Sequence, residues 1–269
     1  MSSREIKVAR KIVVTSGKGG VGKTTVTANL GQALARLGER VALIDVDFGL
    51  NNLDVVMGVE NRVVYDIKDI LEGRCRVKQA LVSASDRKNL FVLPSAGLLP
   101  SSPVSGQQLK LIIENIAEVF DYILIDCPAG IDAGFHRAVS CADEAIVVAT
   151  PSIPSLRDAD KALAVLKSYK PDFTGLIVNR ARGDLMLDGK MMTPRDIESL
   201  LKTPLIGVLP EEDEVFLNSG YPLPKNAESY KAYKILAENL RKKTNRVYDV
   251  TSKYSGFFGS IRRSLKKSI

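Results

Sequence analysis

Residues 11–25 read Lys-Ile-Val-Val-Thr-Ser-Gly-Lys-Gly-Gly-Val-Gly-Lys-Thr-Thr. A β-branched run leads into a glycine-rich turn and then a helical pattern, and Gly17 to Thr24 match G-x-x-x-x-G-K-S/T in full. Glycines let the backbone adopt positive φ and approach a ligand closely. Successive N–H groups and the positive end of the following helix then face an anion. The stretch therefore predicts a phosphate-binding loop.

Each fixed residue of this loop has an expected role in holding a nucleoside triphosphate. Lys23 is expected to reach the β and γ phosphates and to support catalysis, while the Thr24 hydroxyl coordinates Mg²⁺. The alternative is a glycine-rich turn that binds nothing, but a strand before it and a helix after it favour the phosphate site. The residues predicted to contact the nucleotide here are Gly17, Gly19, Gly20, Val21, Gly22, Lys23, Thr24 and Thr25.

The length and composition of the chain fit one α/β domain. It has 269 residues, of which 45% are hydrophobic and 26% charged, so it can bury a full core. Only the short apolar run Ile12–Val14 precedes polar residues near the start, which is too short for a signal peptide. No apolar run reaches the roughly 18 residues of a spanning helix. We therefore expect a cytoplasmic protein without a membrane-spanning helix.

The cysteines and the histidine give no sign of a metal site or a catalytic triad. The chain has three cysteines, Cys75, Cys127 and Cys141, and one histidine, His136. The cysteines show no C-x-x-C pair or metal-ligand spacing, and with a single histidine this argues against a His/Cys metal site and a Ser-His-Asp triad. The absence of C-x-x-C also argues against an iron–sulfur carrier. We interpret all four as structural residues.

The positive charge of the chain is concentrated at its end. The formal net charge is +7, from 38 Lys and Arg against 31 Asp and Glu. Nine of the basic residues but only one acid, Asp249, follow Leu240, which leaves 29 bases and 30 acids in residues 1–240. The body is nearly neutral, and the basic character belongs to the tail.

Apolar, β-branched runs alternate with amphipathic segments along the chain. This alternation predicts crossover connections, and hence a doubly wound, mostly parallel sheet with helices on both faces, in a single α/β domain of the P-loop NTPase class. The expected strands are residues 11–15, 41–44, 90–93, 122–125, 145–149, 175–178 and 204–208. The expected helices include residues 24–37, 107–119, 155–168, 193–200 and, at the end of the body, 226–243.

Two of the expected strands end in aspartates. Asp45 and Asp47 follow one apolar run and Asp126 follows another, and ligands in such sheets bind beyond the carboxyl ends of the strands. Asp126 fits the Walker B role of holding Mg²⁺, Asp45 is better suited to orient the attacking water, and Asp47 to hold a water bound to Mg²⁺. The alternative is that each aspartate only caps the next element, which is weaker beside a P-loop.

Lys18 is not required by the general P-loop pattern. The run Lys-Gly-Gly-Val-Gly-Lys-Thr-Thr, from Lys18 to Thr25, resembles the deviant Walker A motif of the MinD/ParA ATPases. The resemblance implies ATP as the nucleotide, an ATP-dependent homodimer, and a catalytic Lys18 that reaches the phosphates bound by the partner subunit. A second ammonium there would neutralise developing charge. The alternative is a solvated surface lysine.

The resemblance extends over nearly the whole chain. Residues 45–66 are more similar to the division-site-placing branch of this family than to the partition branch, and further matching segments are residues 126–131, 142–145, 155–158 and 178–180. By this likeness, the residues lining the adenine pocket are Asn179, Arg180, Pro210 and Glu211. The chain departs from the family at Asn51, usually arginine, and at Cys127, commonly serine. Asn51 puts in doubt any partner contact that needs a charge there.

The end of the chain carries a second, independent signal. At helical steps of about 100°, one face collects Tyr254, Phe257, Phe258, Ile261, Leu265 and Ile269, and the opposite side Arg262, Arg263, Lys266 and Lys267. This pattern is typical of an anchor lying in an anionic membrane surface. We expect an ATPase domain over 1–243, a linker over 244–253 and a membrane-targeting amphipathic helix over 254–269. The alternatives are a helix docked on the body and a disordered basic tail that binds nucleic acid.

Together these signals predict a membrane-cycling ATPase. ATP favours the dimer, the dimer presents two anchors, and hydrolysis returns a monomer that leaves the inner face of the cell membrane. The resemblance implies slow, partner-stimulated hydrolysis, and placement of the division site through a MinC-like inhibitor and a MinE-like or other topological factor.

Three other functions compete with this prediction. A flagellar-number regulator of the same family would also carry a membrane tail. A ParA-like partition ATPase would need basic residues on its body for DNA, and the near-neutral body argues against it. A P-loop synthetase or kinase for a small molecule is disfavoured by Lys18 and by the tail. We expect no sequence-specific nucleic acid as a partner.

Overall fold

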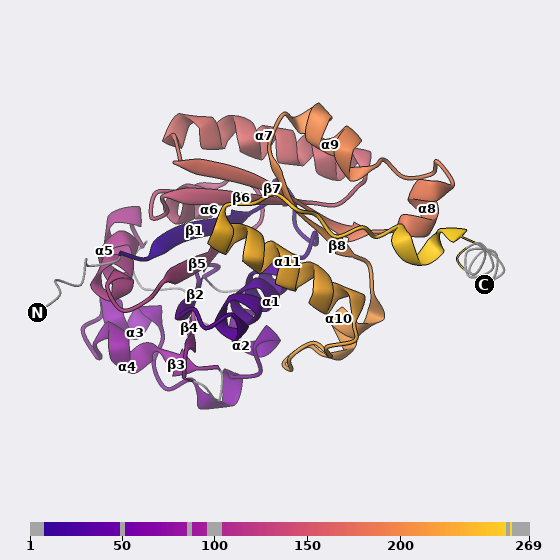
Figure 1. The fold of residues 1–269 in the computed structure, drawn as a ribbon. Helices are drawn as coiled ribbons and strands as arrows, with labels where there is room; N and C mark the ends of the chain where they lie inside the picture. The colour runs from indigo at the N-terminus through magenta and orange to yellow at the C-terminus, as the bar shows by residue number, and fades with distance from the viewer. Residues whose placement is uncertain (1–7, 49–51, 85–87, 96–103, 257–258, 260–269) are drawn as a thin grey trace, which may run out of the picture.

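The computed structural model describes residues 8–48, 52–84, 88–95, 104–256 and 259. In this part of the chain the strands form one eight-stranded sheet with the order β3-β4-β2-β5-β1-β6-β7-β8 (Figure 1). The strands are β1 (Arg10–Thr15), β2 (Val41–Asp45), β3 (Val82–Ser83), β4 (Leu90–Leu93), β5 (Tyr122–Asp126), β6 (Glu144–Ala149), β7 (Phe173–Ala181) and β8 (Leu205–Pro210). Every neighbouring pair is parallel except β3 with β4.

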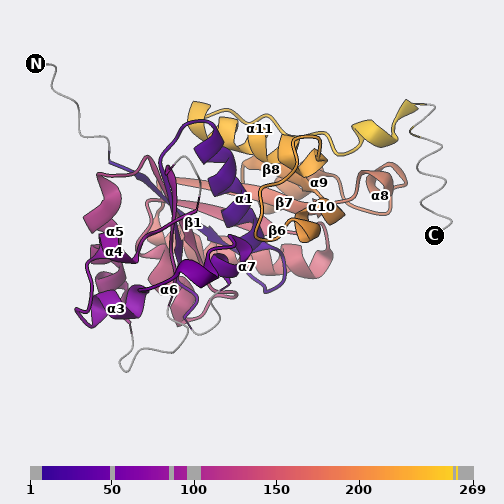
Figure 2. The same cartoon turned by 90° about the horizontal axis from the view of Figure 1, so that it is seen from below.

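Helices cover both faces of this sheet (Figures 1 and 2). The longer ones are α1 (Lys23–Arg36), α5 (Gly106–Ala117), α7 (Ile153–Tyr169), α9 (Pro194–Leu201) and α11 (Glu228–Lys242). The shorter ones are α2 (Leu53–Val56), α3 (Ile67–Leu71), α4 (Val77–Ala80), α6 (Ala133–Val139), α8 (Gly183–Leu187) and α10 (Asp213–Leu217), with 3₁₀ turns η1 (Glu60–Arg62) and η2 (Ser252–Tyr254). None of the helices described is both long and apolar enough to cross a bilayer.

The sheet separates two hydrophobic cores. α1 and α11 pack into the core on one face, and α5, α6, α7 and α9 into the core on the other. On β1, Ile12 and Val14 belong to the first core and Val13 to the second, because successive side chains of a strand point to opposite faces. β1 lies between β5 and β6, so the loop that follows it leaves the sheet at the middle of its carboxyl edge.

The predicted doubly wound, mostly parallel sheet is confirmed, and each expected strand and helix has a counterpart. The sequence analysis misses β3, a two-residue antiparallel edge strand, because so short a segment has no periodicity of its own. It also predicts β7 too short. β7 runs on to Ala181 through a register shift after Val178, and Arg180 within this irregularity has φ 55°.

The segment after α11 packs against the body, where the sequence analysis predicts a polar linker. Val250 is only 5% exposed, and its carbonyl lies so close to Gly183 that a Cβ there would come within 2.0 Å of the oxygen. Tyr254 is buried as well and ends η2. It therefore contacts the body, although the sequence analysis assigns it to the apolar face of the tail.

Several predictions fall on residues outside the described part of the chain. They are Asn51 and the membrane-facing residues Phe257, Phe258, Ile261, Arg262, Arg263, Leu265, Lys266 and Lys267. The amphipathic anchor and the domain boundaries therefore stay predictions.

Candidate nucleotide-binding site

The loop between β1 and α1 follows a closely packed path that requires glycine at two positions. Gly22 has φ 91°, and a Cβ there would lie 2.6 Å from the side-chain nitrogen of Asn179. Gly17 is confined even more, since a Cβ would come within 1.8 Å of the Asp158 carbonyl oxygen in α7. No side chain in the described residues caps the first N–H groups of α1. These groups are therefore free to receive an anion.

Lys23, Thr24 and Asp126 lie together at the base of this loop. Thr24 Oγ1 donates a 2.6 Å hydrogen bond to Oδ2 of Asp126, and Thr27 donates a 3.1 Å bond to Oδ1. Burial raises the pKa of Asp126 to about 6, although the Thr24 bond, the charge of Lys23 and the Thr27 bond oppose it. Lys23 is only 8% exposed. A buried ammonium beside a hydroxyl and a carboxylate suits phosphate oxygens and Mg²⁺.

Asp45 lies at the end of β2 and is held by backbone N–H groups. Its Oδ1 accepts from Asp47 at 2.9 Å, and its Oδ2 accepts from Asn52 and Leu53 at 3.2 Å each. Burial, and then the neighbouring charge of Asp126, raise the pKa of Asp45 to about 7 despite these bonds. Asp45 therefore does cap the start of α2, while also facing Asp126. Its role in orienting water stays a prediction.

Asp47 and Lys18 stand nearer the surface. Burial raises the pKa of Asp47, and the charge of Lys23 opposes that rise, so Asp47 lies within electrostatic range of Lys23. Lys18 is exposed, and its backbone carbonyl accepts a 2.7 Å hydrogen bond from Ser16. The role of Lys18 toward a partner subunit stays a prediction.

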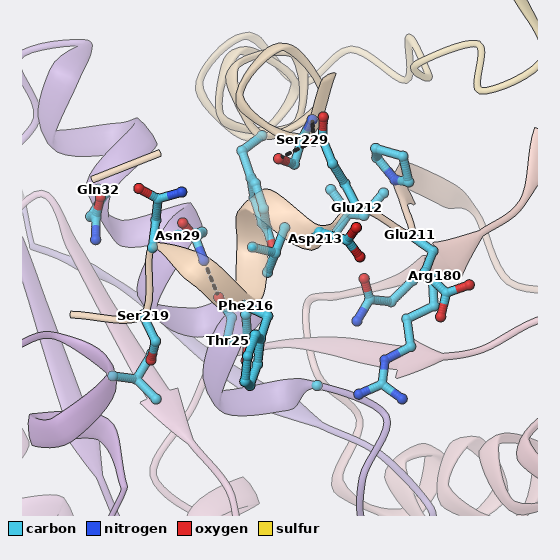
Figure 3. Close-up of a pocket in the computed structure, with 18 of the residues that line it drawn as sticks. Thr25, Asn29, Gln32, Arg180, Glu211, Glu212, Asp213, Phe216, Ser219 and Ser229 are labelled. Atoms are coloured by element: carbon cyan, nitrogen blue, oxygen red, sulfur yellow. Dashed lines mark hydrogen bonds between the residues drawn. The ribbon is translucent and has the colours of Figure 1, made fainter. Parts of the chain in front are cut away.

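A pocket of about 360 Å³ opens beside the phosphate loop (Figure 3). It brings together Gly22 and Thr25 of the loop with all four residues predicted for the adenine pocket, Asn179, Arg180, Pro210 and Glu211. Asn179 also donates a 2.8 Å hydrogen bond to the Val21 carbonyl, which ties β7 to the loop. The pocket thus joins the end of the phosphate loop, at Gly22 and Thr25, to the residues predicted for the adenine.

The sequence analysis misses much of the pocket wall. The missed residues include Asn29, Gln32, Glu212, Asp213, Phe216, Asn218, Ser219, Ser229 and Tyr233. Most of them follow β8. The acidic run from Glu211 to Glu214 and the aromatic Phe216 are the sequence features by which this part of the wall could have been predicted.

Glu212 fixes this wall to α11. Its carboxylate accepts hydrogen bonds from the N–H groups of Glu228 and Ser229, at 3.1 and 2.8 Å, and from the Ser229 hydroxyl at 2.6 Å. Burial acts to raise the pKa of Glu212, but these bonds and the charge of Lys253 outweigh it and lower the pKa. Glu212 is thus a structural residue that fixes the chain just before α10. After α10, the N–H of Gly220 donates to the Val56 carbonyl in α2.

The contacts of the cysteines and of His136 agree with structural roles. Burial raises the pKa of Cys127 to about 12, so its thiol stays protonated. Cys141 donates to backbone carbonyls of Gly106 and Arg137, and His136 pairs with the Tyr169 hydroxyl.

The CobQ/CobB/MinD/ParA nucleotide binding domain family matches residues 12–222. A septum site-determining protein MinD from Synechocystis is 43% identical over 261 residues, which cover 95% of this chain and 98% of the relative.

Two solved structures share the fold. The MinC:MinD cell division protein complex of Aquifex aeolicus contains a chain with 43% identity and a TM-score of 0.80, covering 88% of this chain and 97% of that one. The septum site-determining protein MinD of Pyrococcus horikoshii, complexed with Mg-ADP, has 31% identity and a TM-score of 0.78, covering 87% and 97%.

Proposed function

Because the chain belongs to the CobQ/CobB/MinD/ParA nucleotide-binding family, we propose that it is an ATPase that dimerises with ATP, cycles on and off the membrane and places the division site. The observation that carries the proposal is that buried Lys23 and Asp126 lie beside Thr24 at the base of the phosphate loop. The similarity to proteins that determine the septum site supports the cellular role.

The chain's own residues divide the work of hydrolysis. Lys23 and the N–H groups of α1 hold the phosphates, and Thr24 and Asp126 would hold Mg²⁺, with Asp47 beside them. Bound Mg²⁺ would neutralise charge on the phosphate oxygens. Asp45 orients the attacking water, and Lys18, exposed on the same edge, enters the site of the partner subunit. Hydrolysis is slow until a partner stimulates it.

The partners follow from the relatives and from the tail. The complex of a similar MinD with MinC supports a MinC-like inhibitor as the cargo recruited to the membrane. The basic, apolar tail supports attachment to anionic lipid on the cytoplasmic face, strengthened when a dimer presents two copies. A MinE-like or other topological factor completes the system.

Co-sedimentation with anionic liposomes in ATP and in ADP tests this proposal. We expect ATP-dependent lipid binding by the full chain, and loss of that binding in a variant that ends at Gly256 and so keeps the buried Tyr254. A matched control is Lys231→Gln with Lys234→Gln, which removes charge from exposed positions of α11 and should still bind lipid. The same preparation is assayed for DNA binding. ATP-dependent DNA binding without a lipid response would contradict the proposal and favour a partition ATPase.

A further inference from the structure

Phe216 is an aromatic side chain that the fold leaves almost fully in solvent. It is 83% exposed, the highest value among the large hydrophobic side chains described. Burial of a phenylalanine stabilises a protein by about 1.5–3 kcal/mol, and Phe216 contributes almost none of this. It lies on α10, a short helix with no fully buried residue, in which Val215 packs against the core on the α1 and α11 face. Its position therefore calls for a ligand or a partner.

The side chain of Phe216 faces the nucleotide pocket. Phe216 lines the pocket, and Figure 3 shows it beside Thr25 of the phosphate loop. Its neighbour Leu217 is also exposed, at 69%, but does not line the pocket. Of these two adjacent apolar residues, Phe216 therefore faces the pocket and Leu217 faces solvent.

The charges around the pocket decide which part of a nucleotide lies near Phe216. The phosphates belong at the loop, where Lys23 and the N–H groups of α1 provide positive potential. The opposite wall carries the carboxylates of Glu211, Glu212 and Asp213, which would repel a polyphosphate. The remaining space can accept only the neutral end of the ligand, its base and ribose.

Arg180 provides a second planar group at this end. The register shift in β7 and the φ of 55° at Arg180 direct its exposed side chain away from the regular strand. Arg180 and Phe216 both line the pocket, and Figure 3 shows Arg180 to the right of Phe216. A guanidinium plane and an aromatic ring are both surfaces on which a base can stack.

We propose that Phe216 is the stacking face for the nucleobase, a positioning residue that sets how tightly the base end of the nucleotide is held. This proposal rests on the proposed ATPase function and names a binding residue within it. Stacking of a base on an aromatic ring tolerates any base. The contribution of Phe216 should therefore be alike for ATP and GTP, and absent for inorganic tripolyphosphate.

The absence of tryptophan from the chain permits a direct test. A Phe216→Trp variant carries the only indole, and Leu217→Trp is the matched control one residue away. We expect Mg-ATP to quench the fluorescence of Phe216→Trp and Mg-tripolyphosphate to leave it unchanged, while Leu217→Trp responds to neither. Equal quenching of Phe216→Trp by ATP and by tripolyphosphate would mean that the pocket closes without stacking, and would overturn the proposal.

Affinity measurements give the second readout. Phe216→Ala should weaken Mg-ATP and Mg-GTP binding by about 10-fold and leave tripolyphosphate binding unchanged, whereas Leu217→Ala should change neither. Because Phe216 packs against so little, circular dichroism should show an unaltered fold. Wild-type affinity for ATP in Phe216→Ala would refute the stacking role and leave Phe216 as a surface for another protein. Failure of the wild-type chain to bind ATP would instead refute the proposed function.

Discussion

The two ends of the nucleotide pocket are built in opposite ways. The phosphate end comes from one continuous stretch, residues 17–24, and its lysine is 8% exposed. The base end is assembled from α1, β7, the segment after β8 and α11, and one of its aromatic residues, Phe216, is 83% exposed. The fold therefore fixes the phosphate end before a ligand arrives, whereas Phe216 at the base end gains its packing only from the ligand.

Removal of the phosphate-binding charge should have the largest effect on binding. Lys23→Ala leaves no ammonium at the base of the loop, so we expect Mg-ATP affinity to fall by about 100-fold or more in calorimetric titration. The matched control is Lys18→Ala, which removes an exposed lysine from the same loop. Under conditions in which the protein is monomeric, it should bind Mg-ATP nearly as well as wild type. Binding by Lys23→Ala within a few-fold of wild type would contradict the assignment.

Two glycines of the loop offer a steric test of how firmly the phosphate end is fixed. A Cβ at Gly17 would lie 1.8 Å from the Asp158 carbonyl oxygen, whereas the nearest atom to a Cβ at Gly19 is 3.6 Å away. We expect Gly17→Ala to lower the free energy of unfolding by about 2–3 kcal/mol, and Gly19→Ala by less than about 1 kcal/mol. Urea denaturation measures both. Equal effects would show that the contact with α7 does not constrain the loop.

The buried aspartates predict a specific pH dependence of stability. The pKa of Asp45 rises from 3.8 in its reference state to about 7 in the fold. Between these values the folded chain holds a proton that the unfolded chain has lost, so the free energy of unfolding falls as pH rises. Asp126, with a pKa of about 6, acts in the same direction.

Asp45→Asn isolates the contribution of Asp45 to this dependence. Between about pH 5 and about pH 7, the variant should lose a stability change on the order of 1–2 kcal/mol that wild type shows. The free energy of unfolding of both proteins is measured by urea denaturation across this pH range, without nucleotide and with a chelator that removes divalent cations. Identical pH profiles for the two proteins would mean that Asp45 is ionised throughout this range.

The smallest expected effect concerns the joint between the two ends. Asn179→Ala removes the hydrogen bond to the Val21 carbonyl, which should cost about 1 kcal/mol, or about 5-fold in ATP affinity. Asn218→Ala is a control from the same wall. In the bonds described, the Asn218 side chain donates only to the carbonyl and the carboxylate of Glu214 in α10. An unchanged ATP affinity in Asn179→Ala would mean that the hydrogen bond from β7 to the phosphate loop does not contribute to binding.

The sequence leads directly to a prediction for the phosphate end, because its residues are adjacent in the chain and match one motif. Asp126 and Asp45 are also found from sequence, since each ends an apolar strand. The wall of the base end is harder to predict from sequence, because Gln32, Phe216 and Ser229 come together only after α1, α10 and α11 have packed.

The end of the chain shows the same limit. A polar composition over residues 244–253 predicts a linker, yet the tertiary contacts of Val250 and Tyr254 bind this segment to α8. No local sequence pattern predicts the contact of Val250 with Gly183, because the two residues lie far apart in the sequence.

Competition between separate parts of the nucleotide tests the central claim, that the phosphate end is preformed and anchors the ligand. Mg-ATP bound to the wild-type chain is titrated with Mg-tripolyphosphate and, separately, with adenosine. We expect tripolyphosphate to displace ATP and adenosine to displace almost none at the same concentration. Displacement by adenosine alone, with no effect of tripolyphosphate, would contradict the account and place the anchor at the base end.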